Sequence, residues 1–172
     1  TAADRTSGEL LRKADIALYR AKAEGRSRFV LFTEELDRTP TERFDLDNAL
    51  RRSVERDELL LHYQPLVDLK SGLIVGGEAL VRWLSPGQGM VAPGYFIPAA
   101  EHSGLIVPLG EWVLQEACRE LAHWHAQGCA QLSMAVNISP IQFRRGDVEE
   151  TLRRALAASG APPFALELEL TE

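Results

Sequence analysis

The sequence predicts an α/β fold in which parallel strands alternate with helices. From residue 59 onward, apolar runs of strand length alternate with longer segments of helical periodicity, in the order strand, strand, helices, strand, helix, strand. Such alternation favours parallel crossover units. The helical segments recur at the intervals of a (β/α) barrel, and a complete barrel needs about 250 residues. We therefore expect an antiparallel first strand pair followed by parallel strands, together forming roughly the first half of a TIM-like barrel.

The composition is that of an ordinary globular protein, with 172 residues, 45% hydrophobic and 26% charged. The net charge of −6 argues against binding to a DNA or RNA duplex, although metals could still supply positive charge for a phosphodiester. Cys118 and Cys129 have no disulfide-framework spacing, which indicates a reducing compartment. No signal peptide opens the chain, and no apolar run approaches the ~20 residues that span a bilayer. We expect a cytoplasmic protein, or the cytoplasmic part of a membrane-anchored parent.

Residues 1–33 predict one helix and one short strand. The helix covers residues 7–24 and ends at Gly25, and the strand covers residues 29–32. The apolar stripe of this helix consists of Leu10, Ala14, Ala17, Leu18 and Ala21. A lone helix and strand cannot bury their apolar faces. We therefore expect residues 1–33 to be the tail of a domain whose body lies upstream.

A polar linker, residues 34–42, separates this tail from the rest of the chain. Within it, Thr39-Pro40-Thr41-Glu42 combines a cap, a proline at the first helical position and a glutamate at the capping-box position. This signal predicts the sharp start of a second helix. It also marks a domain boundary, and we expect the second domain to cover residues 43–172.

The two strands after this helix are expected to form an antiparallel hairpin. They cover residues 59–67 and 73–83, and Lys70-Ser71-Gly72 forms the turn between them. In the second strand, Gly76 and Gly77 allow a neighbouring group to approach the backbone closely. These glycines directly precede Glu78, the first acidic residue of that strand.

Side chains of the second strand alternate between two faces. One face carries Ala79, Val81 and Trp83, and the other carries Glu78, Leu80 and Arg82. We expect the first face to pack against a core. The Cα atoms of Glu78 and Arg82 lie about 13 Å apart at roughly 3.3 Å per residue. This distance is too long for an ion pair, so each charge needs another partner.

The remaining chain predicts a loop, three helices and two strands. The loop covers residues 85–94, the helices cover residues 96–101, 110–127 and 147–158, and the strands cover residues 132–138 and 165–170. Gly128 and Gly160 end the second and third of these helices.

Three of the expected strands carry oxygen-bearing side chains near their ends, namely Glu78, Asn137 and Glu169. In (β/α) barrels the functional residues come from the carboxyl ends of several strands. Carboxylate and amide oxygens suit Mg²⁺ or Mn²⁺ better than zinc, and inward-facing acids are costly to bury without a metal, partner or proton. The sequence therefore predicts a Mg²⁺ or Mn²⁺ site, with solvated charges at strand ends as the alternative.

Other polar residues favour structural roles. Glu167 is expected to be a buried structural acid, and Glu101 a structural residue on its helix. His123 and His125 are two residues apart on a helix and do not face each other, so they do not predict a metal site. The same interpretation applies to His62, His102 and Cys118.

Five motifs occur in one order along residues 43–172. They are Tyr63-Gln64-Pro65, Glu78-Ala79-Leu80-Val81-Arg82-Trp83, Pro93-Gly94-Tyr95-Phe96-Ile97-Pro98-Ala99-Ala100-Glu101, Val136-Asn137-Ile138-Ser139 and Glu169-Leu170-Thr171-Glu172. Together they resemble the motifs of EAL domains, the cyclic di-GMP phosphodiesterases. Several motifs in the correct order are stronger evidence for a family than any single motif. Upstream, Ala14-Asp15-Ile16-Ala17-Leu18-Tyr19-Arg20-Ala21-Lys22 and Gly25-Arg26 resemble the C-terminal helix and strand of a GGDEF (diguanylate cyclase) domain.

The resemblance implies a role for each matched position. Glu78, Asn137 and Glu169 would be metal ligands, and Glu172 would be the glutamate that holds the following loop in its active shape. Gln64, Leu80 and Arg82 would contact the nucleotide, Leu80 through its backbone and Arg82 through a phosphate. Two alternatives remain, because Arg82 could instead pair with the inner acids and Gln64 could simply end the ladder before Pro65.

The reaction implied is metal-dependent hydrolysis of cyclic di-GMP to linear pGpG, with Mg²⁺ or Mn²⁺ as cofactor. The family's downstream aspartate pair, lysine and further glutamates lie beyond this sequence, so we expect the fragment alone to be inactive. The alternative function is an EAL-like receptor that binds cyclic di-GMP or a protein without hydrolysing it. Homodimerisation through EAL domains and upstream sensor domains are further expectations from the resemblance, and the activity of the GGDEF domain is left open.

Overall fold

The computed structural model describes residues 7–23, 29–33 and 40–170, and the chain divides into two compact units, Thr1–Asp45 and Leu46–Glu172. In these described ranges, no helix has both the length and the apolar character needed to cross a membrane. The predicted cap Thr39, most of the predicted linker and the expected stop at Gly25 lie outside them.

The first unit contains helix α1 (Ser7–Ala23), which agrees with the prediction to within one residue. Ala17 and Ala21 are buried, and the Lys13 ammonium lies 5.4 Å from the centroid of the Phe32 ring. The predicted strand at residues 29–32 is wrong, because these residues form no strand. A strand needs a hydrogen-bonded neighbour, and none pairs with residues 29–33 in the described part of the chain.

Helix α3 (Pro40–Glu55) begins at the proline that the sequence places at the first helical position. The predicted start of the second helix is therefore confirmed, and the last three residues of the predicted linker, 40–42, form the first turn of this helix. The part of α3 in the second unit buries Leu46, Leu50 and Ser53, and the Ser53 hydroxyl donates a hydrogen bond to the Leu50 carbonyl at 2.7 Å.

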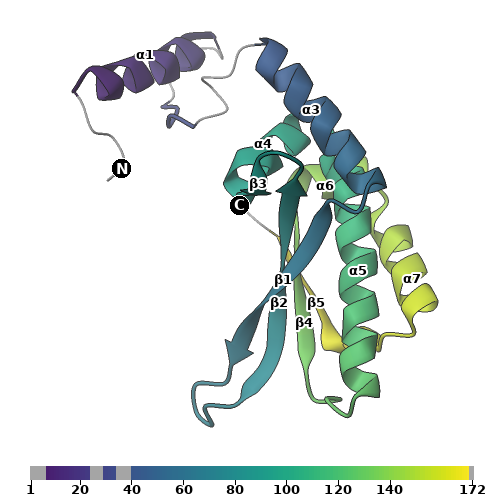
Figure 1. The fold of residues 1–172 in the computed structure, drawn as a ribbon. Helices are drawn as coiled ribbons and strands as arrows, with labels where there is room; N and C mark the ends of the chain where they lie inside the picture. Colours follow the sequence, from purple (N-terminus) through teal and green to yellow (C-terminus); the bar gives the residue numbers. More distant parts are fainter. Residues whose placement is uncertain (1–6, 24–28, 34–39, 171–172) are drawn as a thin grey trace. The chain divides into compact units, whose positions relative to one another are not determined.

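The second unit is built on one sheet of five strands (Figure 1). They are β1 (Leu59–Val67), β2 (Ile74–Ser85), β3 (Gly89–Val91), β4 (Ser133–Ile138) and β5 (Leu166–Leu170). The order is β1-β2-β4-β5, and β3 pairs with the end of β2. β1 and β2 form an antiparallel hairpin, whereas β2, β4 and β5 run parallel. The predicted α/β fold with an antiparallel first strand pair is therefore confirmed for these residues.

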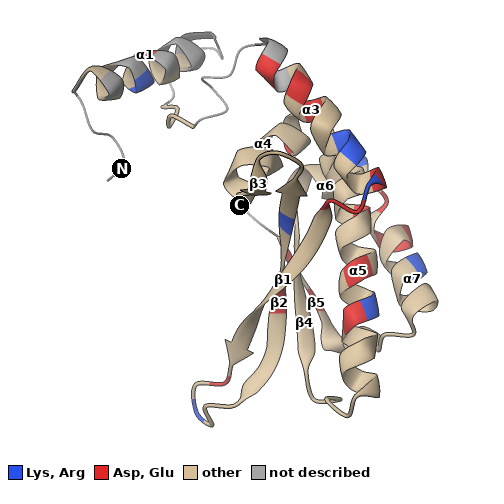
Figure 2. Ribbon diagram, in the orientation of Figure 1, with Lys and Arg blue, Asp and Glu red and all other residues tan. Residues whose placement is uncertain are grey.

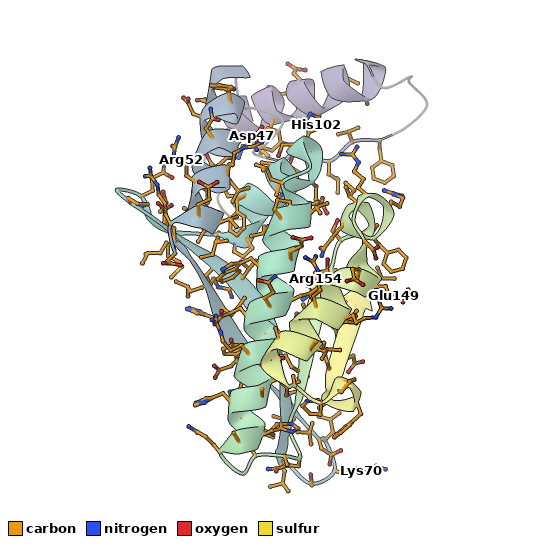
Figure 3. The ribbon with its side chains drawn as sticks, turned by 90° about the vertical axis from the view of Figure 1, so that its right-hand side faces the viewer. Asp47, Arg52, Lys70, His102, Glu149 and Arg154 are labelled. Carbon is orange, nitrogen blue, oxygen red and sulfur yellow. The ribbon has the colours of Figure 1, made fainter. Side chains whose placement is uncertain are left out.

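The tip of the β1–β2 hairpin is closed by local hydrogen bonds. The Asp68 carboxylate accepts from both the amide and the hydroxyl of Ser71, at 2.7 Å each. The side-chain bond from Ser71 is the main cause that lowers the pKa of Asp68 below its usual value. Lys70 lies at this tip, as Figure 3 shows.

Helices connect the parallel strands. They are α4 (Pro93–Ser103), α5 (Ile106–Ala126), α6 (Pro140–Arg145), α7 (Val148–Ser159) and the short 3₁₀ helix η1 (Pro163–Ala165). Residues 85–94 are not the simple loop that the sequence predicts, because β2 extends to Ser85 and β3 folds back along it. Gly87 and Gly89 make this reversal possible with φ values of 86° and 73°.

Helices α5 and α7 cover one face of the sheet (Figure 1). Beneath them lies a core that includes Ala79, Leu121 and Val136, all at most 3% exposed. A second core joins α3, α4 and the end of β2. There Trp83 meets Phe96 edge to face at 5.8 Å between ring centroids, and the Trp83 indole donates to the Glu58 carboxylate at 3.2 Å. Figure 2 shows charged positions on α3, α5 and α7 and few on the strands.

The two adjacent glycines of β2 allow its close packing. A Cβ atom on Gly76 would lie 2.5 Å from the Ser133 Oγ atom and 2.6 Å from the Ser133 carbonyl oxygen. A Cβ atom on Gly77 would lie 3.0 Å from the Trp124 ring. The close approach predicted from the sequence is therefore confirmed, and at Gly76 it involves the neighbouring strand β4.

Candidate functional site

The face of the sheet opposite the helices carries the predicted site residues. Residues paired across a sheet share a face, and the register pairs Gln64 with Glu78 and Asn137 with Glu169. By alternation along each strand, this face carries Gln64, Glu78, Leu80, Arg82, Asn137 and Glu169. The prediction that Glu78, Leu80 and Arg82 lie opposite a packing face is confirmed, because Ala79 and Trp83 are 3% and 2% exposed.

Asn137 and Glu78 meet directly, although 59 residues separate them in the sequence. The Asn137 amide donates a hydrogen bond from Nδ2 to Glu78 Oε1 at 2.6 Å, and both side chains are partly buried. Glu169 is opposite Asn137 in the β4–β5 register and is exposed. Three neighbouring strands thus bring two carboxylates and one carboxamide to the same face of the sheet. Asn137 and Glu169 lie next to the last residues of β4 and β5, whereas Glu78 lies within β2 and not at its end as predicted.

The chemistry of this donor set fits a hard divalent cation. Because Asn137 uses its Nδ2 atom to reach Glu78, its Oδ1 atom remains available as an oxygen ligand, together with the second carboxylate oxygen of Glu78. No cluster of three His, Cys, Asp or Glu side chains that could hold a metal occurs among the residues described. A cation site on this face would therefore depend on the amide oxygen of Asn137.

Arg82 is partly buried, and its Nη1 atom donates to the Val81 carbonyl at 2.9 Å. Within the described ranges it forms no ion pair with the acids of its face, which disfavours the alternative in which it neutralises them. The remaining donors of its guanidinium suit an anion such as a phosphate.

Gln64 is exposed beside Glu78, and Leu80 is partly covered opposite His62. The alternative in which Gln64 ends the ladder is wrong, because β1 continues through Pro65 to Val67. β1 is the last strand on its side of the described sheet, where a proline can be accommodated.

Other predictions for polar residues had mixed outcomes. Glu167 is exposed rather than buried, because no described element covers its face of β5. Glu172 lies outside the described residues. The histidines of α5 have separate partners, since His123 Nε2 lies 3.0 Å from Gln127 Nε2 and His125 Nε2 lies 2.8 Å from the Leu132 carbonyl. The interpretation that they form no joint metal site is consistent with these contacts.

Burial perturbs two groups in the core between α5 and the sheet. It raises the pKa of the Cys118 thiol to about 11 and, as the main cause, the pKa of Tyr63 to about 12. Tyr63 packs edge to face against Trp124 at 5.3 Å between centroids. Neither group faces the candidate site.

One contact beside the site was missed in the sequence. The Ser139 hydroxyl donates to Glu101 Oε1 at 2.5 Å, whereas the sequence predicts only a structural role for Glu101 on its helix. Both residues line a cavity of about 190 Å³ together with Asn137 and Arg82. The sequence contains a signal for the cap but not for this contact, because a serine directly before a proline is typical of a helix N-cap.

These features define an α/β domain with a candidate cation and phosphate site on the face of its sheet opposite α5. The chain belongs to the EAL domain family, whose sequence model matches residues 47–172.

Relatives are similar along most of this chain. The bifunctional diguanylate cyclase/cyclic di-GMP phosphodiesterase MucR of Pseudomonas aeruginosa is 42% identical over 168 residues, which are 98% of this chain and 24% of the relative. The cyclic di-GMP phosphodiesterase PdeR of Escherichia coli is 41% identical over 166 residues, which are 96% of this chain and 25% of the relative. The chain thus spans about a quarter of the length of these curated relatives.

Solved EAL structures share the mixed α/β fold. The PaMucR phosphodiesterase in complex with c-di-GMP matches with a TM-score of 0.71 and 45% identity, covering 74% of this chain and 52% of that chain. The Xanthomonas citri FimX EAL domain in complex with c-diGMP matches with a TM-score of 0.67 and 28% identity, covering 77% of this chain and 51% of that chain.

Proposed function

We propose that the whole protein is a metal-dependent phosphodiesterase that hydrolyses cyclic di-GMP to linear pGpG. Membership of the EAL family and the likeness to relatives named as cyclic di-GMP phosphodiesterases support this proposal. The observation that carries it for this chain is the meeting of Asn137 with Glu78 at 2.6 Å, opposite Glu169 in the strand register.

Each site residue has a proposed role. Glu78, Asn137 and Glu169 supply oxygen ligands to Mg²⁺ or Mn²⁺. A bound divalent cation lowers the pKa of a coordinated water and offsets charge on the phosphoryl oxygens. Arg82 binds a phosphate of the substrate, which fits its lack of an acidic partner among the described residues.

Two further residues contact the nucleotide in this proposal. Gln64 lies beside Glu78 on the uncovered face, and Leu80 lies one alternation further along β2, where its backbone would border the ligand. Glu172 holds the loop that follows β5. Together these groups fix the phosphodiester in front of the attacking water, and orientation of this kind accounts for a large part of catalysis in phosphoryl transfer.

The surroundings of the domain are also proposed. The sheet is part of a (β/α) barrel, because β5 has a partner on one side only among the described strands and its Leu170 is 64% exposed. Residues 1–33 belong to the end of a GGDEF domain, residues 34–42 join it to the EAL domain, and the EAL domain starts at residue 43. Upstream sensor domains and pairing of EAL domains are the partners that we expect for the whole protein.

A Glu78→Gln variant of the full-length protein tests the function. Glutamine keeps the shape of the side chain and an oxygen that can accept from Asn137 Nδ2, so the strand ends should stay in place while one anionic ligand is lost. We expect the rate of cyclic di-GMP hydrolysis in Mg²⁺ or Mn²⁺ to fall by about 100-fold or more. Loss of a residue that only orients a metal ligand lowers activity by about 10–100-fold, and loss of the ligand itself should lower it at least as much.

The matched control is Glu149→Gln on α7, which makes the same charge change at a residue whose side chain is 83% exposed (Figure 3). Its rate should stay within twofold of wild type. Unchanged hydrolysis by Glu78→Gln would show that the ligand assignment is wrong. Binding of cyclic di-GMP by the wild-type protein without any hydrolysis would favour the receptor function instead.

A further inference from the structure

Glu101, in the last turns of α4, and Ser139, directly before α6, form a hydrogen bond between two elements. The Ser139 hydroxyl donates to Glu101 Oε1 at 2.5 Å, and its oxygen accepts from the Ile141 amide at 3.2 Å. Ser139 is 6% exposed, so water has little access to it. Fixed protein groups therefore use both the donor and an acceptor position of this hydroxyl.

Glu101 has no cationic partner in the part of the chain that the structure describes. A partly buried carboxylate loses hydration, and a bond to one neutral hydroxyl offsets this loss only in part. The pair is therefore a weak source of stability, and its geometry is the more informative property.

The geometry connects Glu101 to the candidate site. Ser139 follows Asn137 by two residues, at the turn where β4 ends and α6 begins. Glu101, Asn137 and Ser139 all border the cavity of about 190 Å³, so side chains do not fill all of the space between α4 and this turn. Among the described residues, the Glu101–Ser139 bond is the hydrogen bond that joins α4 to this turn.

Movement of this turn would carry Asn137 with it. The Asn137 amide reaches Glu78 at 2.6 Å, and a shift of about 1 Å would break a bond of this length. We propose that Glu101 is a positioning residue, which acts through Ser139 to hold the Asn137 amide oxygen where it can bind a divalent cation. This inference rests on the proposed function for the role of Asn137.

The test measures metal binding separately from turnover. Mn²⁺ is titrated into the full-length protein without substrate, and free Mn²⁺ is followed by electron paramagnetic resonance. We expect Glu101→Ala and Ser139→Ala each to weaken Mn²⁺ binding by about tenfold, the size typical of lost groups that orient a metal ligand. In hydrolysis assays both should lower kcat by a similar factor and leave KM for cyclic di-GMP within twofold.

Two further variants separate positioning from general destabilisation. Glu101→Gln keeps an oxygen that accepts from Ser139, so it should recover most of the Mn²⁺ affinity. Glu120→Ala removes a comparable bond from α5, in which the Trp124 indole donates to Glu120 Oε1 at 2.7 Å. This control should leave Mn²⁺ binding and kcat unchanged even where it lowers the unfolding temperature.

Each outcome decides the inference. Wild-type Mn²⁺ affinity in Glu101→Ala and Ser139→Ala would overturn it, and so would equal losses in Glu101→Gln and Glu101→Ala. If Glu101→Ala does not fold, Ser139→Ala and Glu101→Gln decide. A wild-type protein that binds Mn²⁺ but does not hydrolyse cyclic di-GMP would overturn the proposed function alone, because the Mn²⁺ titrations would still test the position of Asn137.

Discussion

Gly76→Ala is the substitution that should most directly disturb the contact between β2 and β4. The added Cβ atom would lie 2.5 Å from the Ser133 Oγ atom and 2.6 Å from the Ser133 carbonyl oxygen. The hydroxyl can rotate away, but the carbonyl belongs to the backbone of β4. Relief therefore requires the two strands to separate by roughly 0.8 Å or more, since carbon and oxygen atoms pack at about 3.4 Å.

The expected cost follows from overpacking of a close-packed interior. Such insertions cost about 1–3 kcal/mol, and replacing a strand glycine returns about 0.5–1 kcal/mol of backbone entropy. Because one of the clashing atoms belongs to the backbone, we expect the overpacking cost to fall in the upper half of its range and Gly76→Ala to lower the free energy of unfolding by about 1–2 kcal/mol. Gly77→Ala should cost less, because its Cβ atom would meet the edge of the Trp124 ring at 3.0 Å and a ring can tilt.

Urea denaturation followed by tryptophan fluorescence measures the effect, and a loss of about 1–2 kcal/mol shifts the midpoint by roughly 0.5–1 M. Gly94→Ala is the matched control, because nothing lies within 4 Å of its added Cβ atom. The reasoning is refuted if Gly76→Ala and Gly94→Ala have midpoints within 0.2 M of each other, a margin of roughly 0.4 kcal/mol.

Two further predictions follow from the groups that burial perturbs. Cys118 is fully buried with a pKa of about 11, whereas Cys129 is partly exposed. Thiol reagents at pH 8 should therefore modify Cys129 in the folded protein and Cys118 only after unfolding, and mass spectrometry of the labelled protein can check this order. Burial raises the pKa of Tyr63 from 10.0 to about 12, so between these pH values the folded state keeps a proton that the unfolded state releases. The contribution of Tyr63 to the free energy of unfolding is therefore constant below pH 10 and falls between pH 10 and 12. Tyr63→Phe should lack this decrease of the unfolding midpoint between pH 10 and 12. The same decrease in Tyr63→Phe as in the wild type would show that Tyr63 is not the group responsible.

The parts of the fold that the sequence predicts are those with a regular period. The two-residue alternation in β2 separates Glu78 and Arg82 from Ala79 and Trp83, and the structure separates them in the same way. The alternation of strands with helices predicts the parallel pairing of β2, β4 and β5. Both signals are local, and each covers enough residues to establish a period.

The parts that the sequence does not predict depend on distant partners or on very short elements. β3 has three residues and α6 has six, which are too few to show a period. Residues 29–32 have strand composition but no described neighbour to pair with. The Glu101–Ser139 bond joins residues 38 positions apart, and nothing in either local sequence specifies the other. The prediction that Glu167 is buried is wrong, because alternation predicts which face of a strand a residue occupies but not what covers that face.

The strict alternation of β2 also determines where the domain can tolerate changes in chain length. A single residue inserted between Gly77 and Glu78 would turn every later side chain of the strand over, so that Trp83 would meet solvent and Arg82 would enter the apolar layer. An insertion beside Lys70, at the exposed hairpin tip, would leave this alternation intact. Natural variation in length and engineered tags or reporter modules should therefore be accommodated at the tip of this hairpin and excluded from the strand a few residues away.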